Sequence, residues 1–266
     1  MAKRPGSHVS RKKSSAADAD LRLFRLPGLP EFQLGDDLAG LFAEAARKAR
    51  TTFENGDVLV VAQKIVSKAE GAVVRLATVR PSAQALALAA RLKKDPRAIE
   101  VVLQQSRRIV RSDHVLIAET RHGFICANAG VDHSNVPGED VVTLLPRDPD
   151  QSAKKLAAAL RELTGKRVAV IISDTFGRPW RLGLTDVAIG ASGVPVLHDL
   201  RGTHDRHGKP LTATVLAVAD ELASAAGLLM RKSEGSPAIL IRGYRFKPSS
   251  DPATNIIRPA NEDLFR

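Results

Sequence analysis

Three short, continuous apolar runs constrain most strongly what this chain can fold into. They occupy residues 57–62 (DVLVVA), 168–173 (VAVIIS) and 237–242 (PAILIR). Runs of this length that are rich in Val, Ile and Leu and bounded by polar residues indicate strands, and the first two lack the polar alternation of a half-exposed strand. The sequence therefore predicts two buried strands and, near its end, a third strand.

Helical periodicity occurs between these runs. Leu38, Phe42 and Ala45 share one face of the first periodic segment, and Gly165 follows the third as a helix-ending signal. Helices are expected at 37–52, 82–94, 150–164 and 211–230, a helix followed by a strand at 97–112, a short strand at 21–26, and a hairpin formed by 114–120 and 123–127. Because helices and strands mix without a strict βαβ rhythm, the prediction is an α+β fold of mixed sheets with flanking helices.

Composition sets the domain organisation. The 266 residues suffice for one large domain or two interleaved ones, and 44% hydrophobic against 4% aromatic residues predicts an aliphatic core. Residues 1–20 are polar and basic, so a disordered tail is expected there. Residues 21–247 are predicted to form the folded domain, and the proline-containing segment 248–266 an extended C-terminal tail.

The formal net charge of +11 suits acidic ligands, either small phosphorylated molecules or nucleic acid, although basic surfaces are often only solvated. Cys126 is the single cysteine, so a disulfide framework is excluded and a reducing compartment is expected. No apolar run is long enough to span a bilayer, and no hydrophobic segment follows the basic N-terminus. The expected location is the cytoplasm.

Common nucleotide and metal motifs are absent. There is no G-x-G and hence no Rossmann fingerprint, no H-E-x-x-H, and too few cysteines for a Cys-rich zinc site. The segment from Gly202 to Lys209 has the wrong spacing for a phosphate loop, and Pro210 stands where Ser or Thr should follow. A nucleotide would therefore bind on a less common scaffold.

The sharpest chemical candidate is Asp174, directly after VAVIIS. A carboxylate at the end of a buried strand has a rigid mount, and Mg²⁺ needs only one or two carboxylates besides phosphate oxygens and water. Thr175 can add a hydroxyl ligand, and Arg178 can neutralise phosphate charge. The alternative is that Asp174 only caps a turn.

Three further polar segments could join such a site. Asp132 and Asn135 lie in a glycine-containing loop, where one offers a second carboxylate and the other an amide that can meet a base or ribose. Lys68 follows the first buried strand and can meet a triphosphate, and the basic loop 231–237 can cover phosphates. Taken alone, an ordinary turn explains the Asp132 segment better, and most single lysines are only solvated. A surface connection explains 231–237 equally well.

Taken together, these segments resemble one family, the coenzyme F420-0:L-glutamate ligases, in which F420 denotes a deazaflavin redox cofactor. The resemblance runs from about Leu23 to Phe246. It rests on GLPEF at 28–32, GDVLVVAQKIVSKAEG at 56–71, NAGVDHSNV at 128–136, ISDTFGRPWRLGLTDVAIG at 172–190, DLRGTHDRHGKPL at 199–211 and ADELASAAGLLM at 219–230. Several long matches in the right order are far more specific than any one motif.

The resemblance implies GTP as energy source, a pair of divalent metals (Mg²⁺ or Mn²⁺) assisted by K⁺, and an intertwined homodimer. It implies that Asp132 and Asp174 hold one metal and that Thr175 reaches the second. The implied GTP pocket comprises Gly28, Leu29, Pro30, Glu31, Gln63, Lys68, Asn135, Met230, Arg231, Lys232, Ser233, Glu234, Gly235 and Ser236. Two positions depart from the family: Gln63 stands where many members have Ser or Thr, and Lys232 where some place a Gln on the second metal.

The implied reaction is formation of an amide between the terminal carboxylate of F420-0 and L-glutamate through an acyl phosphate, with further γ-linked glutamates to follow. Asp132, Asp174 and Arg178 are the expected catalytic residues. Two alternatives remain at this stage: the same ligase chemistry on another carboxylate, and a basic nucleic-acid-binding protein. The tail 1–20 separates them, because only the nucleic-acid hypothesis needs it.

Overall fold

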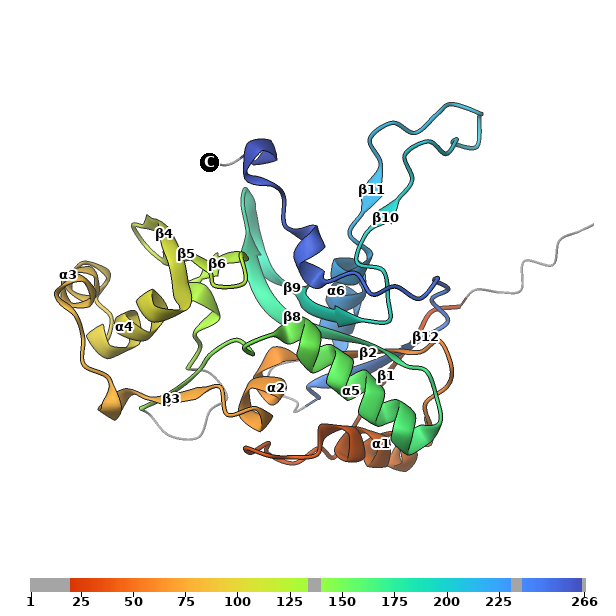
Figure 1. Ribbon diagram of the computed structural model, residues 1–266, viewed down its shortest axis with the longest axis horizontal. Helices are drawn as coiled ribbons and strands as arrows, with labels where there is room; N and C mark the ends of the chain where they lie inside the picture. Colours follow the sequence, from red (N-terminus) through yellow and green to blue (C-terminus); the bar gives the residue numbers. More distant parts are fainter. Residues whose placement is uncertain (1–19, 134–139, 231–235, 265–266) are drawn as a thin grey trace, which may run out of the picture.

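A five-stranded sheet forms the centre of the molecule in the computed structural model, which describes residues 20–133, 140–230 and 236–264 (Figure 1). The order of its strands is β1 (Arg22–Arg25), β12 (Ala238–Arg242), β2 (Val58–Ala62), β8 (Ala169–Arg178) and β9 (Arg181–Ser192). Only β2 and β8 pair in parallel; the other three pairings are antiparallel. The mixed sheet confirms the predicted α+β class.

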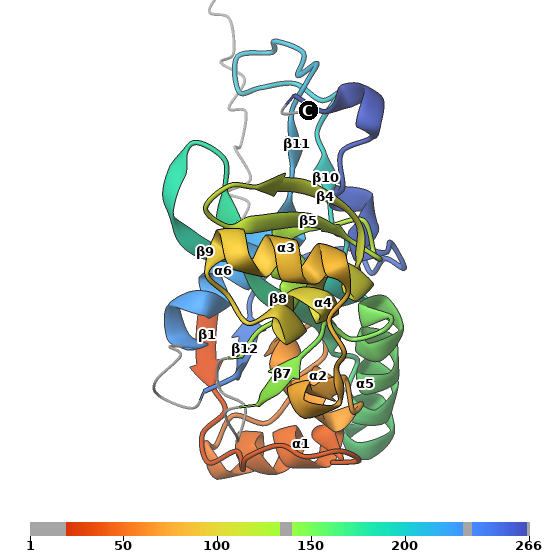
Figure 2. The same ribbon diagram turned by 90° about the vertical axis from the view of Figure 1, so that its left-hand side faces the viewer.

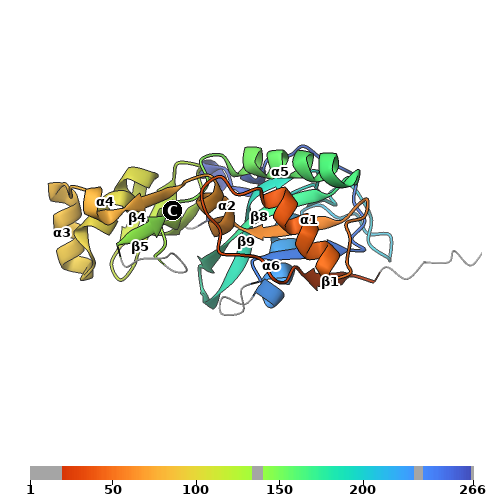
Figure 3. The same cartoon turned by 90° about the horizontal axis from the view of Figure 1, so that it is seen from below.

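Helices cover both faces of this sheet. Figure 3 shows α5 (Pro149–Thr164) on one side of the strands and α6 (Val218–Met230) on the other, with α1 (Leu38–Lys48) beside α5. Val58, Val60, Ile171 and Ile239 are completely buried in the main core, as the continuous apolar runs predicted. Helix α5 ends at Gly165, whose φ of 69° is the left-handed conformation that favours glycine at a helix end.

A second, smaller layer packs beside the main sheet. It contains α3 (Ala83–Leu92), α4 (Pro96–Gln105) and a three-stranded antiparallel sheet of β4 (Ser106–Ser112), β5 (Leu116–Thr120) and β6 (Ile125–Ala127) (Figures 1 and 2). This layer has its own cluster of buried residues, including Leu76, Ile99 and Leu116. The strands β3 (Val73–Arg75) and β7 (Val141–Thr143) pair where the chain enters and leaves the layer.

The remaining elements are short. Helix α2 (Gln63–Ala69) follows β2 directly, and β10 (His198–Asp199) pairs with β11 (Val215–Leu216) at the base of a projecting loop (Figure 2). Single 3₁₀ turns lie at η1 (Leu76–Thr78), η2 (Asn128–Gly130), η3 (Ala253–Ile256) and η4 (Ala260–Glu262). Within the described ranges, no helix combines the length and apolarity needed to cross a bilayer.

Two element boundaries differ from the sequence prediction. A helix over 211–230 is wrong in its first part, because 215–216 pair with β10 and the helix begins at Val218. The strand predicted to end at Ser173 continues to Arg178, because β9 supplies a pairing partner over its whole length. Asp174 is therefore inside a strand rather than at its end.

Candidate functional site

The candidate site lies where the parallel pairing of β2 with β8 ends. Ala62, the last residue of β2, aligns with Ser173 of β8, so β8 runs on from Asp174 with β9 as its only neighbour in the sheet. The chain of β2 turns at once into α2, which begins at Gln63. One edge of β8 is therefore left without β2 beside the start of α2, and a cavity lies at this place.

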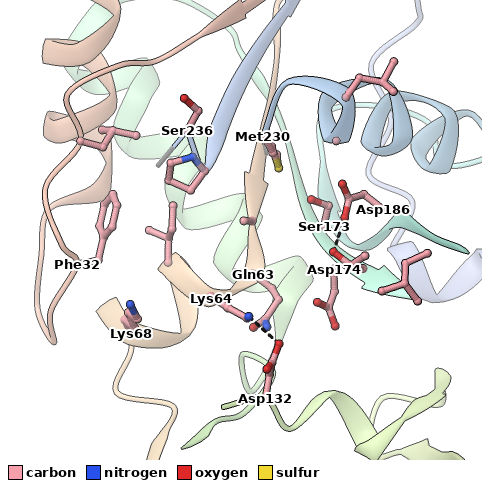
Figure 4. A pocket seen from close by; sticks show the side chains of 18 of the residues that line it. Phe32, Gln63, Lys64, Lys68, Asp132, Ser173, Asp174, Asp186, Met230 and Ser236 are labelled. Carbon is pink, nitrogen blue, oxygen red and sulfur yellow. Dashed lines mark hydrogen bonds and ion pairs between the residues drawn. The ribbon is translucent and has the colours of Figure 1, made fainter. Parts of the chain in front are cut away.

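The cavity has a volume of about 890 Å³ and receives residues from seven parts of the chain. Figure 4 shows Lys68 and Phe32 on one side of it, Asp174 and Asp186 on the other, and Lys64 with Asp132 between them. The lining residues are Leu29, Pro30, Glu31, Phe32, Ala62, Gln63, Lys64, Ile65, Lys68, Asp132, Ser173, Asp174, Thr175, Leu184, Thr185, Asp186, Ser224, Gly227, Leu228, Met230, Ser236 and Pro237.

The fold brings together most residues that the sequence singled out. Leu29, Pro30, Glu31, Gln63, Lys68, Asp132, Asp174, Thr175, Met230 and Ser236 all line the cavity. Of the described candidates, Gly28 and Arg178 do not line it, and Arg178 is exposed at the far end of β8. Asn135 and residues 231–235 lie outside the described residues.

Sequence reasoning missed several lining residues, among them Lys64, Asp186 and Gly227. Lys64 and Asp186 bring charged groups to the cavity, and Gly227 lets α6 approach Asp186. Lys64 stands next to Gln63 in the sequence and could have been included on that ground. Asp186 and Gly227 gave no such signal, because strand register and helix packing bring them to the cavity.

Acidic side chains dominate one side of the cavity. Asp132 is fixed by a backbone bridge to Thr143, with N–O distances of 3.1 and 2.9 Å, and its Oδ2 lies 2.6 Å from Lys64 Nζ. Burial, helped by the nearby charges of Asp132 and Asp186, raises the pKa of Asp174 to about 6 against the lowering effects of the Thr175 backbone N–H and of Lys64. The protein thus places carboxylates where their mutual repulsion favours a cation.

A hydrogen-bonded pair lies beside these carboxylates. Thr175 Oγ1 donates to Asp186 Oδ1 at 2.6 Å across the β8–β9 register. Ser224 of α6 donates its hydroxyl to the backbone oxygen of Asp186 at 2.8 Å. The Thr175 hydroxyl is therefore held by Asp186 of β9, whose backbone is in turn held by α6.

The Gln63 amide is the unusual polar group of the site. It is 1% exposed, and its Nε2 has no hydrogen-bond partner among the described residues. Its Oε1 lies 2.8 Å from the Ser67 hydroxyl, which is also 2.7 Å from the backbone oxygen of Leu144. A buried polar atom without a partner costs free energy, so this atom is suited to meet a ligand.

Two other groups near the cavity are already engaged or chemically quiet. Lys68 forms an ion pair with Glu31 across the cavity's other side. Burial, with a smaller contribution from the Asp174 charge, raises the pKa of the Cys126 thiol to about 12. A thiol so protonated is not a nucleophile at neutral pH, and the Cys126 side chain is buried.

The donor set fits a hard divalent cation that is held partly by substrate. Asp132 and Asp174 offer carboxylate oxygens and Thr175 a hydroxyl oxygen, and in the described ranges no three His, Cys, Asp or Glu side chains form a closed metal cage. Mg²⁺ typically takes one or two carboxylates and completes its shell with phosphate oxygens and water. Fold and site together define a class of protein: an α+β domain with one cavity whose carboxylate and hydroxyl oxygens fit a divalent cation and whose lysines fit an anionic ligand.

Comparison with known proteins names the family. The model of the F420-0:gamma-glutamyl ligase family matches residues 28–243, and the chain belongs to this family. It is 48% identical over 254 residues to the coenzyme F420:L-glutamate ligase of Methanopyrus kandleri, covering 92% of this chain and 98% of that protein. The enzymes of the same name from Methanothermobacter thermautotrophicus and Archaeoglobus fulgidus are 45% and 42% identical, each over 92% of this chain and over 99% and 96% of their own lengths.

Proposed function

We propose that this protein is a GTP-dependent ligase that joins L-glutamate to the terminal carboxylate of F420-0. The observation that carries the proposal is the convergence of Asp132, Asp174 and Thr175 with Gln63 and Lys68 in one cavity. Membership of the F420-0:gamma-glutamyl ligase family supports the acceptor and the amino acid.

Asp132, Asp174 and Thr175 would hold the divalent cations, Mg²⁺ or Mn²⁺, with K⁺ assisting. Bound there, such a cation neutralises phosphate charge and draws the phosphoryl and carboxylate oxygens together. The ammonium of Lys64 already pairs with Asp132 at 2.6 Å, so it must yield that carboxylate when a cation binds. Its ammonium would then be within the same cavity as a phosphate oxygen and could pair with it.

GTP would occupy the side of the cavity formed by Leu29, Pro30, Gln63, Lys68 and Ser236. Lys68 would leave its ion pair with the exposed Glu31 and contact a phosphate as a point charge. Gly28, Asn135 and residues 231–235 adjoin these positions in the sequence and stay proposals for the same pocket.

The chemistry needs an activated carboxylate, because a carboxylate does not acylate amines at neutral pH. A carboxylate oxygen of the acceptor forms a bond to the γ-phosphorus of GTP, and the bond to the β–γ bridging oxygen breaks, releasing GDP. The amine of glutamate then attacks the acyl carbon; phosphate leaves, and the nitrogen loses a proton. The protein contributes positioning and charge neutralisation, which account for most catalysis of phosphoryl transfer.

The test is to incubate the purified chain with GTP, Mn²⁺, L-glutamate and F420-0 and to read product mass. A gain of one or more glutamyl units with release of GDP is expected, and Asp132→Ala and Asp174→Ala should abolish it while melting as cooperatively as the wild type. If GTP is hydrolysed only with a different carboxylate present, the acceptor is wrong. If neither variant loses metal-dependent activity, the metal assignment is wrong.

We further propose that the protein works as a homodimer. The β8–β9 hairpin projects from the sheet and carries large apolar side chains into solvent: Trp180 is 88% exposed, Leu182 100% and Leu184 62%. Such a patch on a projecting arm is typical of a surface that another chain covers. Light scattering should give the mass of two chains, and Leu182→Ser with Trp180→Ser should shift it toward one.

A further inference from the structure

The hydrogen bond between Thr175 and Asp186 decides which part of the threonine hydroxyl is available to a ligand. A hydroxyl has one proton and two lone pairs. Thr175 Oγ1 donates to Asp186 Oδ1 at 2.6 Å, so the hydroxyl proton is directed to Asp186. Both lone pairs of Oγ1 remain for other partners, and both residues line the cavity.

We propose that Asp186 is a positioning residue that makes the Thr175 hydroxyl a cation ligand by holding its proton away from the cation. This rests on the proposed function, in which Thr175 reaches a divalent metal. A neutral hydroxyl can bind a cation only through a lone pair, and a proton pointing at the cation would repel it. Carboxylates that orient metal ligands in this way typically change metal affinity by about 10- to 100-fold when they are removed.

The rest of the fold keeps Asp186 in place for this task. Thr175 and Asp186 are directly opposed in the β8–β9 ladder, which sets their separation. Helix α6 packs against Asp186. The Ser224 hydroxyl donates to the backbone oxygen of Asp186 at 2.8 Å and lies 3.0 Å from the Thr185 hydroxyl. Figure 4 shows the Asp186 side chain beside Asp174 at the edge of the cavity under α6.

Gly227 shows how tightly α6 approaches. A Cβ at this position would lie 2.0 Å from Asp186 Oδ2, nearer than two such atoms can come. Any side chain at 227 would push the carboxylate, and with it the hydrogen bond to Thr175, out of place. Glycine at 227 is therefore needed for the hydrogen bond between Thr175 and Asp186 to form as it does.

Two other roles for Asp186 are open to the same experiment. As a direct metal ligand, it would bind the cation whether or not Thr175 has a hydroxyl. As a purely structural tie between β9 and α6, it would affect folding and leave the affinity for metal unchanged. A double-mutant cycle between Thr175 and Asp186 separates all three roles, because residues that act in series are non-additive.

The experiment is titration of the full-length protein with Mn²⁺ in the presence of GDP, with free Mn²⁺ measured by electron paramagnetic resonance. Asp186→Ala and Thr175→Val should each weaken Mn²⁺ binding by about 10- to 100-fold at one class of site. The double variant should bind no more weakly than Thr175→Val alone. Asp186→Asn, whose amide oxygen still accepts from Thr175, should lie between Asp186→Ala and the wild type, and it serves if Asp186→Ala does not fold.

Asp220→Asn is the matched control, because this carboxylate of α6 accepts from the backbone of Ala188 and does not line the cavity. Its Mn²⁺ binding should equal that of the wild type. Further weakening by Asp186→Ala in the Thr175→Val background overturns the proposal in favour of direct ligation. Wild-type Mn²⁺ binding in both Asp186 variants overturns it in favour of a structural tie.

Failure of the proposed function is distinguishable from failure of this inference. Coupled Mn²⁺ binding without any ligation of glutamate would sink the proposed reaction and leave the role of Asp186 standing. Ligation with additive or absent effects on Mn²⁺ binding would do the reverse.

Discussion

The Gln63 amide offers a direct test of where the nucleotide binds. Gln63→Leu preserves the approximate shape of the side chain and removes both polar atoms. In the free protein this change should cost little, because one of those atoms is buried without a partner among the described residues and already carries a desolvation cost. In the proposed complex with GTP, the same substitution should remove a hydrogen bond from the Gln63 amide to the charged nucleotide.

The size of the effect follows from that difference. A hydrogen bond to a charged group, or a buried polar atom left unpaired, is worth about 1–3 kcal/mol. At about 1.4 kcal/mol per tenfold, the Kd for GTP should rise by about 5- to 140-fold. The melting temperature of the free protein should change much less than the increment that saturating GTP adds to it, since ligand stabilisation scales with affinity.

Calorimetric titration with Mn²⁺ and GTP measures the Kd, and thermal melts with and without GTP measure the increment. Gln104→Leu is the control, because Gln104 is exposed on α4 and its side-chain amide donates to Glu100. It should leave both quantities unchanged. A Kd for GTP within about twofold of the wild type in Gln63→Leu would refute the reasoning, because the unpaired amide atom would then not face the nucleotide.

Three further predictions concern stability. Asp57, 1% exposed, accepts from Nε and Nη2 of Arg242 at 2.8 Å each, so Asp57→Ala should cost about 3 kcal/mol or more in chemical denaturation, and a loss under about 1 kcal/mol would contradict it. Asp150→Asn keeps the Oδ1 that accepts from two backbone N–H groups but removes a carboxylate whose pKa burial raises. Between the unfolded pKa of about 4 and the higher folded pKa, the folded wild type binds more protons than the unfolded chain, so its free energy of unfolding falls as pH rises. The free energy of unfolding of the Asn variant should therefore rise relative to that of the wild type across that pH range. The opposite slope would exclude the burial effect. Gly190→Ala puts a Cβ 2.4 Å from a backbone oxygen at the start of α5 and should cost about 3 kcal/mol in thermal melts, whereas Gly177→Ala, whose Cβ meets only a leucine methyl at 3.8 Å, should melt like the wild type.

Local patterns predicted much of the fold. The apolar runs at 57–62 and 168–173 are central strands, and the glycine after the third helix adopts the left-handed conformation that its position predicted. These features depend on neighbours in sequence: burial gives a run its apolar character, and the end of a helix requires a particular φ. The α+β class followed from the same local information.

The sequence prediction was wrong where strand pairing decides the conformation of a segment. The residues after Ser173 are polar and include Gly177, which is typical of a turn, yet they continue the strand because β9 offers backbone groups to pair with. The segment before Val218 has helical composition but lies opposite β10. In each case the conformation is decided by a hydrogen-bonding partner outside the segment itself, which is the second strand of the hairpin for β8 and β10 for 215–216.

The site divides along the same line. By itself the sequence determined which kinds of chemical group the site contains. Residue type and position relative to the predicted strands singled out Asp132, Asp174, Thr175 and Lys68, and the order of the matching segments indicated the family. Only the tertiary structure decided which of these residues share a cavity, and it added Asp186, whose carboxylate reaches Thr175 through the β8–β9 register and under the bare backbone of α6. The physical reason is that residue type and spacing record local burial and chemistry, whereas strand register and helix packing set the distances between groups far apart in the chain.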